Sequence, residues 1–257
     1  MKNITEYPYD PSLLTDRKYF WNCRTKEDLA AYHKKLARRS DNDYQALLSI
    51  TQNNRKLFSL INSTQTFPGW CSLQKGAALA ALVTTLKPAT VIEVGVFGGR
   101  SLLPMAMAVQ DAGLPTKIIG IDPFLATESI KNEQGANLTW WNDQSKHDEV
   151  LEKLLFYLKK FQMEGIVELV KKPSNDFTPV ECDLLHLDGN HCDQALVDAQ
   201  RFGPMVRLGG VVVNDDLMWG AGYVLRSLDA LEDIGFVEVA RTTTDGDCWN
   251  IMQRIKI

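Results

Sequence analysis

From about Thr66 to the C-terminus, short apolar runs alternate with stretches in which apolar residues recur every three or four positions. A short apolar run between turn residues is typical of a buried strand, and the longer spacing is typical of an amphipathic helix. The predicted strands are Thr90–Val94, Lys117–Ile121, Ile166–Val170, Asp183–Leu187, Gly210–Asn214, Phe236–Ala240 and Asp247–Gln253. The predicted helices are Leu73–Leu86, Arg100–Ala112, one with Val150, Leu151, Leu154, Leu155, Leu158 and Phe161, and one with Val224, Leu225, Leu228 and Leu231.

The order of these elements predicts an α/β fold with a doubly wound, mainly parallel sheet of seven strands. The last two predicted strands are joined by a polar turn that contains Asp245 and Gly246. Such a turn is typical of a hairpin, so we expect an antiparallel pair at the edge of the sheet.

The first 65 residues have a different pattern, polar and helical. Thr25 and Asp43 are candidate caps for helices over Lys26–Arg39 and Tyr44–Ile61. We therefore expect a helical extension over residues 1–65 and a second domain over residues 66–257. The extension either packs on the main domain, or it forms a homo-oligomer interface or a cover over the substrate. The pattern leaves this choice open.

Composition narrows the class of protein. The chain has 257 residues and a formal net charge of −4, which argues against broad nucleic-acid binding. Its 5 cysteines form no C-x-x-C pair, so we expect neither a disulfide framework nor a zinc–thiolate site. No apolar run approaches the roughly 18 residues of a membrane span. We expect a cytoplasmic protein with no membrane partner.

The most informative segment is T-V-I-E-V-G-V-F-G-G-R-S, residues 90–101. A buried strand carries an acid, Glu93, and breaks into glycines at Gly95, Gly98 and Gly99. Glycines at the carboxyl end of a parallel strand let backbone approach a ligand closely. The spacing is neither G-x-G-x-x-G nor a P-loop, which disfavours a nicotinamide dehydrogenase. A carboxylate beside the turn favours a cationic nucleotide such as S-adenosylmethionine.

Two further strand ends carry polar residues. Asp122 ends the second strand, where its carboxylate either accepts hydrogen bonds from ribose hydroxyls or belongs to a simple Asp-Pro turn. Ser174 and Asn175 follow the third strand, where they either contact an adenine edge or cap the next helix. In doubly wound sheets ligands bind beyond the carboxyl ends of the strands, which favours the first interpretation of Asp122.

The ends of the fourth and fifth strands carry acids: Asp188, with His191 three residues later, and the pair Asp215–Asp216. If these strands are neighbours, three carboxylates converge and predict a bound cation, because crowded carboxylates repel. Oxygen ligands suit a hard ion such as Mg²⁺. The alternative is that Asp215 and Asp216 cap the next helix. We expect His186 to be a buried histidine rather than a ligand.

Residues Leu73 to Gln253 resemble the class I S-adenosylmethionine-dependent methyltransferases, which have a Rossmann-like fold. More closely they resemble the metal-dependent small-molecule O-methyltransferases related to catechol O-methyltransferase, and especially bacterial members with a D-G-x-H element. The resemblance implies that Asp188 binds both metal and cofactor and that Asp215 and Asp216 bind metal. His191 occupies the position of a catalytic lysine, and Asp216 replaces an asparagine of the catechol enzymes.

Together these observations predict a set of site residues. Cofactor-binding residues are Glu93, Gly95, Gly98, Gly99, Ser101, Asp122, Ser174, Asn175 and Asp188; metal ligands are Asp188, Asp215 and Asp216; catalytic residues are His191 and Asp188.

The predicted reaction is transfer of the methyl group of S-adenosylmethionine to a hydroxyl of a catechol, vicinal diol or sugar-like molecule, assisted by Mg²⁺. Trp140, Trp141 and Trp219, and on weaker grounds Phe97 and Tyr223, are candidates to wall the substrate ring or are ordinary packing residues. Two alternatives stay open. One is a metal-independent methyltransferase, for instance one that acts on nitrogen, and the other is a non-catalytic subunit that binds the cofactor.

Overall fold

Seven strands form one sheet in the order β3-β2-β1-β4-β5-β7-β6. The computed structural model describes residues 45–131, 135–217, 224–242 and 248–256. The strands are β1 (Thr90–Val94), β2 (Lys117–Ile121), β3 (Val167–Val170), β4 (Cys182–Leu187), β5 (Val206–Asn214), β6 (Phe236–Thr242) and β7 (Trp249–Arg254). Strands β1 to β5 are parallel, and β7 runs antiparallel to both of its neighbours. The predicted doubly wound sheet with an antiparallel C-terminal pair is confirmed.

Strand β5 differs from the prediction at its start, which lies at Val206 rather than Gly210. Exposed Arg207, Leu208 and Gly209 interrupt the apolar run, and Gly209 has a φ of 82°. The pairing of β4 with β5 shifts register in this segment, so the early part of β5 is irregular as well as polar. The predicted hairpin turn at Asp245 and Gly246 lies outside the described residues.

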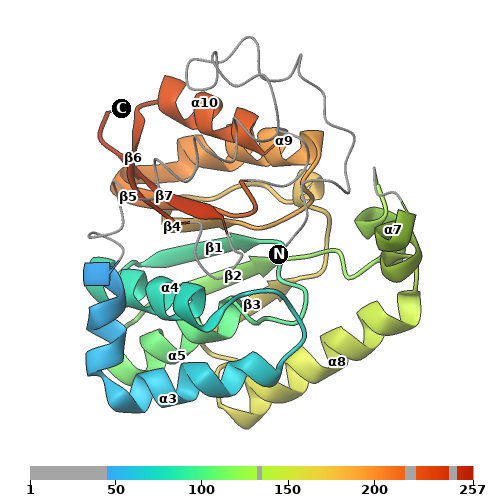
Figure 1. Ribbon diagram of the computed structural model, residues 1–257, viewed down its shortest axis with the longest axis horizontal. Coiled ribbons are helices and arrows are strands. Elements are labelled where there is room, and N and C mark those ends of the chain that lie inside the picture. The colour runs from blue at the N-terminus through green and yellow to red at the C-terminus, as the bar shows by residue number, and fades with distance from the viewer. Residues whose placement is uncertain (1–44, 132–134, 218–223, 243–247, 257) are drawn as a thin grey trace.

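Helices cover both faces of the sheet (Figure 1). One face carries α3 (Arg55–Ser63), α4 (Leu73–Leu86), α5 (Leu102–Ala112) and α8 (Gln144–Lys160), and the other carries α9 (Asp193–Phe202) and α10 (Leu225–Asp233). Short 3-10 helices are η2 (Thr64–Thr66), η3 (Ser174–Asp176) and η4 (Gly203–Met205). Successive residues of β1 pack on opposite faces of the sheet, which have separate apolar clusters. Val91 belongs to the cluster under α3, α4, α5 and α8, and Ile92 to the cluster under α9 and α10.

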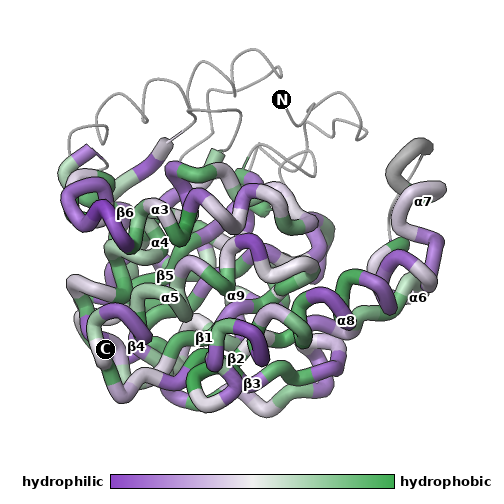
Figure 2. The backbone as a smooth tube through the Cα atoms, turned by 90° about the horizontal axis from the view of Figure 1, so that it is seen from below, coloured by the Kyte–Doolittle hydropathy of each residue, from purple (hydrophilic) through white to green (hydrophobic). Residues whose placement is uncertain are grey.

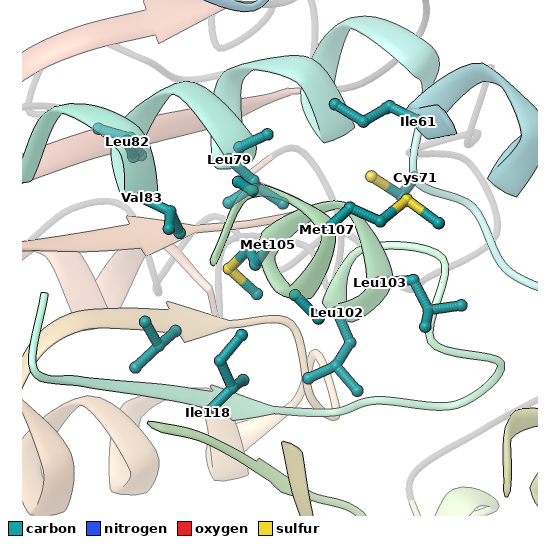
Figure 3. Packing of buried hydrophobic residues seen from close by; sticks show 14 of the residues in the cluster. Ile61, Cys71, Leu79, Leu82, Val83, Leu102, Leu103, Met105, Met107 and Ile118 are labelled. Atoms are coloured by element: carbon teal, nitrogen blue, oxygen red, sulfur yellow. The ribbon is translucent and has the colours of Figure 1, made fainter. Parts of the chain in front are cut away.

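The packing of α4 on α5 depends on small side chains. A Cβ atom on Gly76 would lie 3.2 Å from Pro104 of α5 and 3.3 Å from Ile61 of α3, so glycine sets the spacing of three helices. Figure 3 shows Leu79 and Val83 of α4 gathered with Met105 of α5 in this cluster. Burial of such side chains stabilises each by roughly 1.5–3 kcal/mol.

The end of the N-terminal region packs on the same core. Residues 45–53 are helical, and the predicted helix over Tyr44–Ile61 is interrupted at Asn54. The Asn54 side chain accepts a hydrogen bond from the Leu57 N–H at 3.1 Å, so it caps α3 as a new helix. The Thr51 hydroxyl donates to the carbonyl of Ala77 in α4. The helix over Lys26–Arg39 lies outside the described residues, and the division into two domains stays a prediction.

Two short helices, α6 (Ala126–Ser129) and α7 (Gly135–Trp141), lie in the segment predicted as a loop after β2. Four and seven residues are too few to produce a recognisable helical period. Figure 2 shows α6 and α7 beside one end of α8, where hydrophilic and hydrophobic residues alternate. Among the described residues, no helix is long and apolar enough to cross a membrane.

The turn after β1 requires glycine at position 95 for two reasons. Gly95 has a φ of 88°, and a Cβ atom there would overlap the backbone carbonyl of Asp188. Gly113 also has a positive φ, 60°, but a Cβ atom there would meet nothing within 4 Å. We expect Gly113→Ala to lower the free energy of unfolding by about 1 kcal/mol. We expect Gly95→Ala to lower it by at least about 2 kcal/mol more, because of the overlap.

Urea unfolding of the two variants and the wild-type protein measures this difference. Equal losses in the two variants would show that φ alone, and not the approach of β1 to β4, requires glycine at position 95.

Candidate functional site

A cavity of about 420 Å³ lies beyond the carboxyl ends of β1, β2 and β4. Strand order reverses between β1 and β4, which is where ligands bind in doubly wound sheets. The predicted site residues that line the cavity are Gly95, Ser101, Asp122, Ser174, Asn175, Asp188, His191 and Asp216. Glu93, Gly98, Gly99 and Asp215 lie outside this lining.

Glu93 is fully buried behind the cavity wall. Its Oε1 accepts a hydrogen bond from the Ser101 hydroxyl and lies 2.9 Å from Nδ1 of His186. His186 is itself buried, as expected from its position on the strand. Glu93 therefore orients Ser101, which lines the cavity, and it ties β1 to β4 beneath the site.

Gly98 and Gly99 make room for other parts of this chain. A Cβ atom on Gly98 would overlap the carbonyl of Pro68, and one on Gly99 would lie 2.5 Å from Leu154 of α8. Arg100, next in the chain, donates a hydrogen bond to the carbonyl of Gly69 at 2.7 Å. The glycine turn thus brings the segment before α4 against the cavity rim.

Asp122 anchors the glycine turn. Its Oδ2 accepts hydrogen bonds from the N–H groups of Val96 and Phe97, at 3.0 and 2.8 Å, and its Oδ1 accepts one from Phe124 at 2.7 Å. Burial raises the pKa of the Asp122 carboxyl, and the three backbone donors oppose that shift. Phe97 has a φ of 45°, unusual for a bulky residue, so the Asp122 carboxylate stabilises a strained position.

The rim after β3 is a hydrogen-bonded network. The Ser174 hydroxyl donates to the Asp198 carboxylate at 2.7 Å, and the Gln194 amide donates to the same oxygen at 2.9 Å. Ser174 therefore contacts α9. Pro173 precedes η3, which has no side-chain cap. Sequence reasoning missed Asp198 and Gln194, whose spacing of four residues places them on one face of α9.

The ends of β4 and β5 are adjacent, as expected, but their carboxylates divide between two partners. Asp215 forms an ion pair with Lys75, and Oδ2 of Asp188 lies 3.3 Å from Nζ of the same lysine. Oδ2 of Asp216 lies 2.8 Å from Nε2 of His191. His186, Asp188 and Asp215 offer possible ligand atoms within 4.8 Å of one another.

Lys75 is the site residue that sequence reasoning missed most clearly. It is the only charged residue in α4, whose sequence is L-Q-K-G-A-A-L-A-A-L-V-T-T-L. A lone lysine in an otherwise buried helix needs a carboxylate partner, and that is the signal by which it could have been found.

Aromatic side chains form one wall of the cavity. Trp70 stacks on Phe97 with ring centroids 5.5 Å apart, and Phe97 lies 5.2 Å from Trp141. Trp140 contacts both tryptophans, at 5.3 Å from Trp70 and 4.7 Å from Trp141. His147, which is buried, bonds through Nε2 to the carbonyl of Trp141. Trp219 and Tyr223 lie outside the described residues.

Comparison with known proteins finds similarity to methyltransferases in both sequence and structure. A sequence model of a methyltransferase domain, Methyltransf_24, matches residues 92–217. The curated caffeoyl-CoA O-methyltransferase of Stellaria longipes is 27% identical over 151 residues, which is 58% of this chain and 55% of that protein. The chain thus matches about half the length of this curated relative.

Two solved structures share the fold. One is an O-methyltransferase from Bacillus cereus in complex with S-adenosylhomocysteine, with a TM-score of 0.52, 14% identity and coverage of 79% of this chain and 90% of that chain. The other is an S-adenosylhomocysteine-bound methyltransferase from Podospora anserina, with a TM-score of 0.51, 14% identity and coverage of 77% and 87%.

The sheet has the Rossmann-like fold of the methyltransferases that these comparisons find, and the model of a methyltransferase domain covers its central part, residues 92–217.

The buried carboxyl of Asp198 should make the stability of the protein depend on pH. Burial raises the pKa of its carboxyl above the unfolded value of 3.8, although Ser174 and Gln194 donate hydrogen bonds to it. The folded state then binds more protons than the unfolded state, so this group contributes less stability as the pH rises above about 4. Asp198→Asn keeps the acceptor oxygen and removes the charge. We therefore expect its stability relative to wild type to increase from about pH 4 upward.

Urea unfolding midpoints of wild type and Asp198→Asn, measured across this pH range, test the sign. A relative stability of the variant that falls with rising pH would contradict the burial argument.

Proposed function

We propose that this chain transfers the methyl group of S-adenosylmethionine to a hydroxyl oxygen of a small molecule. The observation that supports this most strongly is that the His191–Asp216 pair shares one cavity with the glycine turn, Asp122 and Asp188. A cofactor-sized cavity and a group able to accept a proton thus lie at the same edge of the sheet.

The cavity suits a cationic nucleoside. Asp188 and Asp122 give its wall two carboxylates, and Oδ1 of Asp122, which accepts one backbone N–H, has a lone pair left for a ligand. Ser174 and Asn175 line the part of the wall formed after β3. When bound, S-adenosylmethionine supplies an electrophilic methyl group on a sulfonium. Asp122 and Asp188 would hold its polar ends, and Ser174 and Asn175 its base.

His191 would take the proton of the acceptor. The imidazole of His191 would accept the hydroxyl proton when the acceptor oxygen is methylated. The Asp216 carboxylate, 2.8 Å from Nε2, orients the ring and stabilises the imidazolium. Asp216 has a φ of 53°, a conformation that aspartate adopts more readily than most residues and that aims its carboxylate at this ring.

Assistance by a divalent metal ion stays a prediction, and no step proposed here depends on it. Of the three predicted ligands, Asp188 and Asp215 face the Lys75 ammonium and Asp216 faces His191. This arrangement fits a divalent ion poorly.

The aromatic wall favours an acceptor with a planar ring, such as a phenol or catechol. Trp70 is about half exposed although it contacts Phe97, Trp140 and Trp141, so its ring presents an apolar face beside the cavity. Offset-stacked and edge-on ring pairs are each worth about 0.5–1.5 kcal/mol beyond buried area.

Variants of the proton-accepting pair test the proposed reaction. With S-adenosylmethionine and a panel of phenols and catechols, we expect wild-type turnover. His191→Ala should lower kcat by about 10²- to 10⁴-fold, since general-base catalysis contributes that much. The dissociation constant of S-adenosylmethionine, from calorimetry, should stay within about twofold, because the proposed role of His191 is confined to the acceptor proton.

Asp216→Asn is the matched comparison, because it keeps a hydrogen-bond acceptor beside His191 and removes only the charge. It should lose less activity than His191→Ala. Full turnover by His191→Ala would remove the proposed base, and cofactor binding without turnover on any acceptor would favour a non-catalytic subunit.

Trp70 tests the substrate class. Trp70→Ala should raise the KM for an aromatic acceptor by about threefold to tenfold, the equivalent of one lost ring contact. The affinity for S-adenosylmethionine should change little. Leu208→Ala, which removes an exposed apolar side chain on β5 outside the cavity lining, is the control. An unchanged KM in Trp70→Ala would argue against a stacked acceptor ring.

A further inference from the structure

Lys75 lies in a position that is unfavourable for a positive charge. Its side chain is 1% exposed, and it sits in the first turn of α4, where Ser72 caps the helix by accepting a hydrogen bond from the Lys75 N–H. Burial disfavours an ammonium group, and the partial positive charge of a helix N-terminus repels it. Strong negative partners are therefore required to keep the group charged.

Those partners come from the ends of two neighbouring strands. The ammonium of Lys75 forms an ion pair with Asp215, after β5, and lies 3.3 Å from Oδ2 of Asp188, after β4. Asp215 is itself buried, and its other oxygen accepts a hydrogen bond from the N–H of Asp216 at 2.9 Å. One lysine thus pairs with two of the three carboxylates whose convergence predicted a metal ion.

A divalent ion placed between these carboxylates would meet the ammonium at close range. Like charges at such distances repel strongly when they are buried, because the local dielectric is low. The third acid does not turn toward this point, since Asp216 contacts His191 instead. The nearby His186 adds a nitrogen rather than the oxygen that Mg²⁺ prefers, so the residues present fit an internal ammonium better than Mg²⁺.

We propose that Lys75 takes the place of the divalent ion. It supplies from within the chain the positive charge that holds Asp188 and Asp215 at the edge of the sheet. Lys75 is a positioning residue, because it acts on the cavity through Asp188, which lines it. The two carboxylates and one ammonium leave one negative charge, which suits the cationic cofactor of the proposed function, on which this part of the inference rests.

The test is divalent-ion binding. Lys75→Met keeps an apolar stem of similar length and removes the charge, so it leaves the buried Asp215 and the partly exposed Asp188 without that cation. In a chelator we expect a lower Tm than wild type. Electron paramagnetic resonance of added Mn²⁺ should show binding at least about tenfold tighter than in wild type, because the repelling ammonium is gone. Mn²⁺ should also raise the Tm of this variant and leave that of wild type unchanged.

Two further variants make the test specific. Lys75→Met combined with Asp215→Asn removes one charge of each sign, so it should recover part of the lost Tm and show no response to Mn²⁺. Lys153→Met removes an exposed lysine that pairs with Glu149 on the surface of α8, and it should change neither readout. If Lys75→Met alone does not fold, folding of the double variant supports the charge pairing.

The proposal is overturned if wild type binds Mn²⁺ and Asp215→Asn abolishes that binding, or if Lys75→Met matches wild type in Tm and in Mn²⁺ affinity. Neither readout involves turnover, so failure of the methyl-transfer assay and failure of this proposal are distinguishable.

Discussion

The contact of Lys75 with two carboxylates is the constraint on which the functional edge of the sheet depends. It joins the first turn of α4 to the ends of β4 and β5, two strands that lie far from α4 in the chain. A buried ammonium without these partners would be strongly destabilising, and so would the carboxylates without the ammonium. The position of Asp188 in the cavity is therefore coupled to the packing of α4 on α5.

A second coupling joins the two halves of the cavity. The Asp122 carboxylate, at the expected cofactor side, accepts the N–H of Phe97 and so stabilises its left-handed conformation. The Phe97 ring then stacks with Trp70 in the aromatic wall. The glycine turn at Asp122 and the aromatic wall thus depend on the same backbone conformation at Phe97, and a ligand that orders one is expected to order the other.

The sequence predicted the sheet and the location of the site, because both follow from local rules. Apolar runs mark strands such as β1 and β2, and the carboxyl ends of parallel strands meet at one edge. The pairing of the acids was not predictable in the same way. Asp188 and Lys75 are separated by 113 positions, and only the packing of α4 brings them together. Asn54 is a different case, because its capping hydrogen bond to Leu57 is local and divides one apolar pattern into two helices.

Calorimetric titration of S-adenosylmethionine into chelator-treated protein tests the central claim most directly, namely that this domain binds its cofactor with a cation supplied by its own chain. The account predicts binding at a single site, with the same affinity before and after Mg²⁺ is added. Cofactor binding that is absent in the chelator and restored by Mg²⁺ would contradict it.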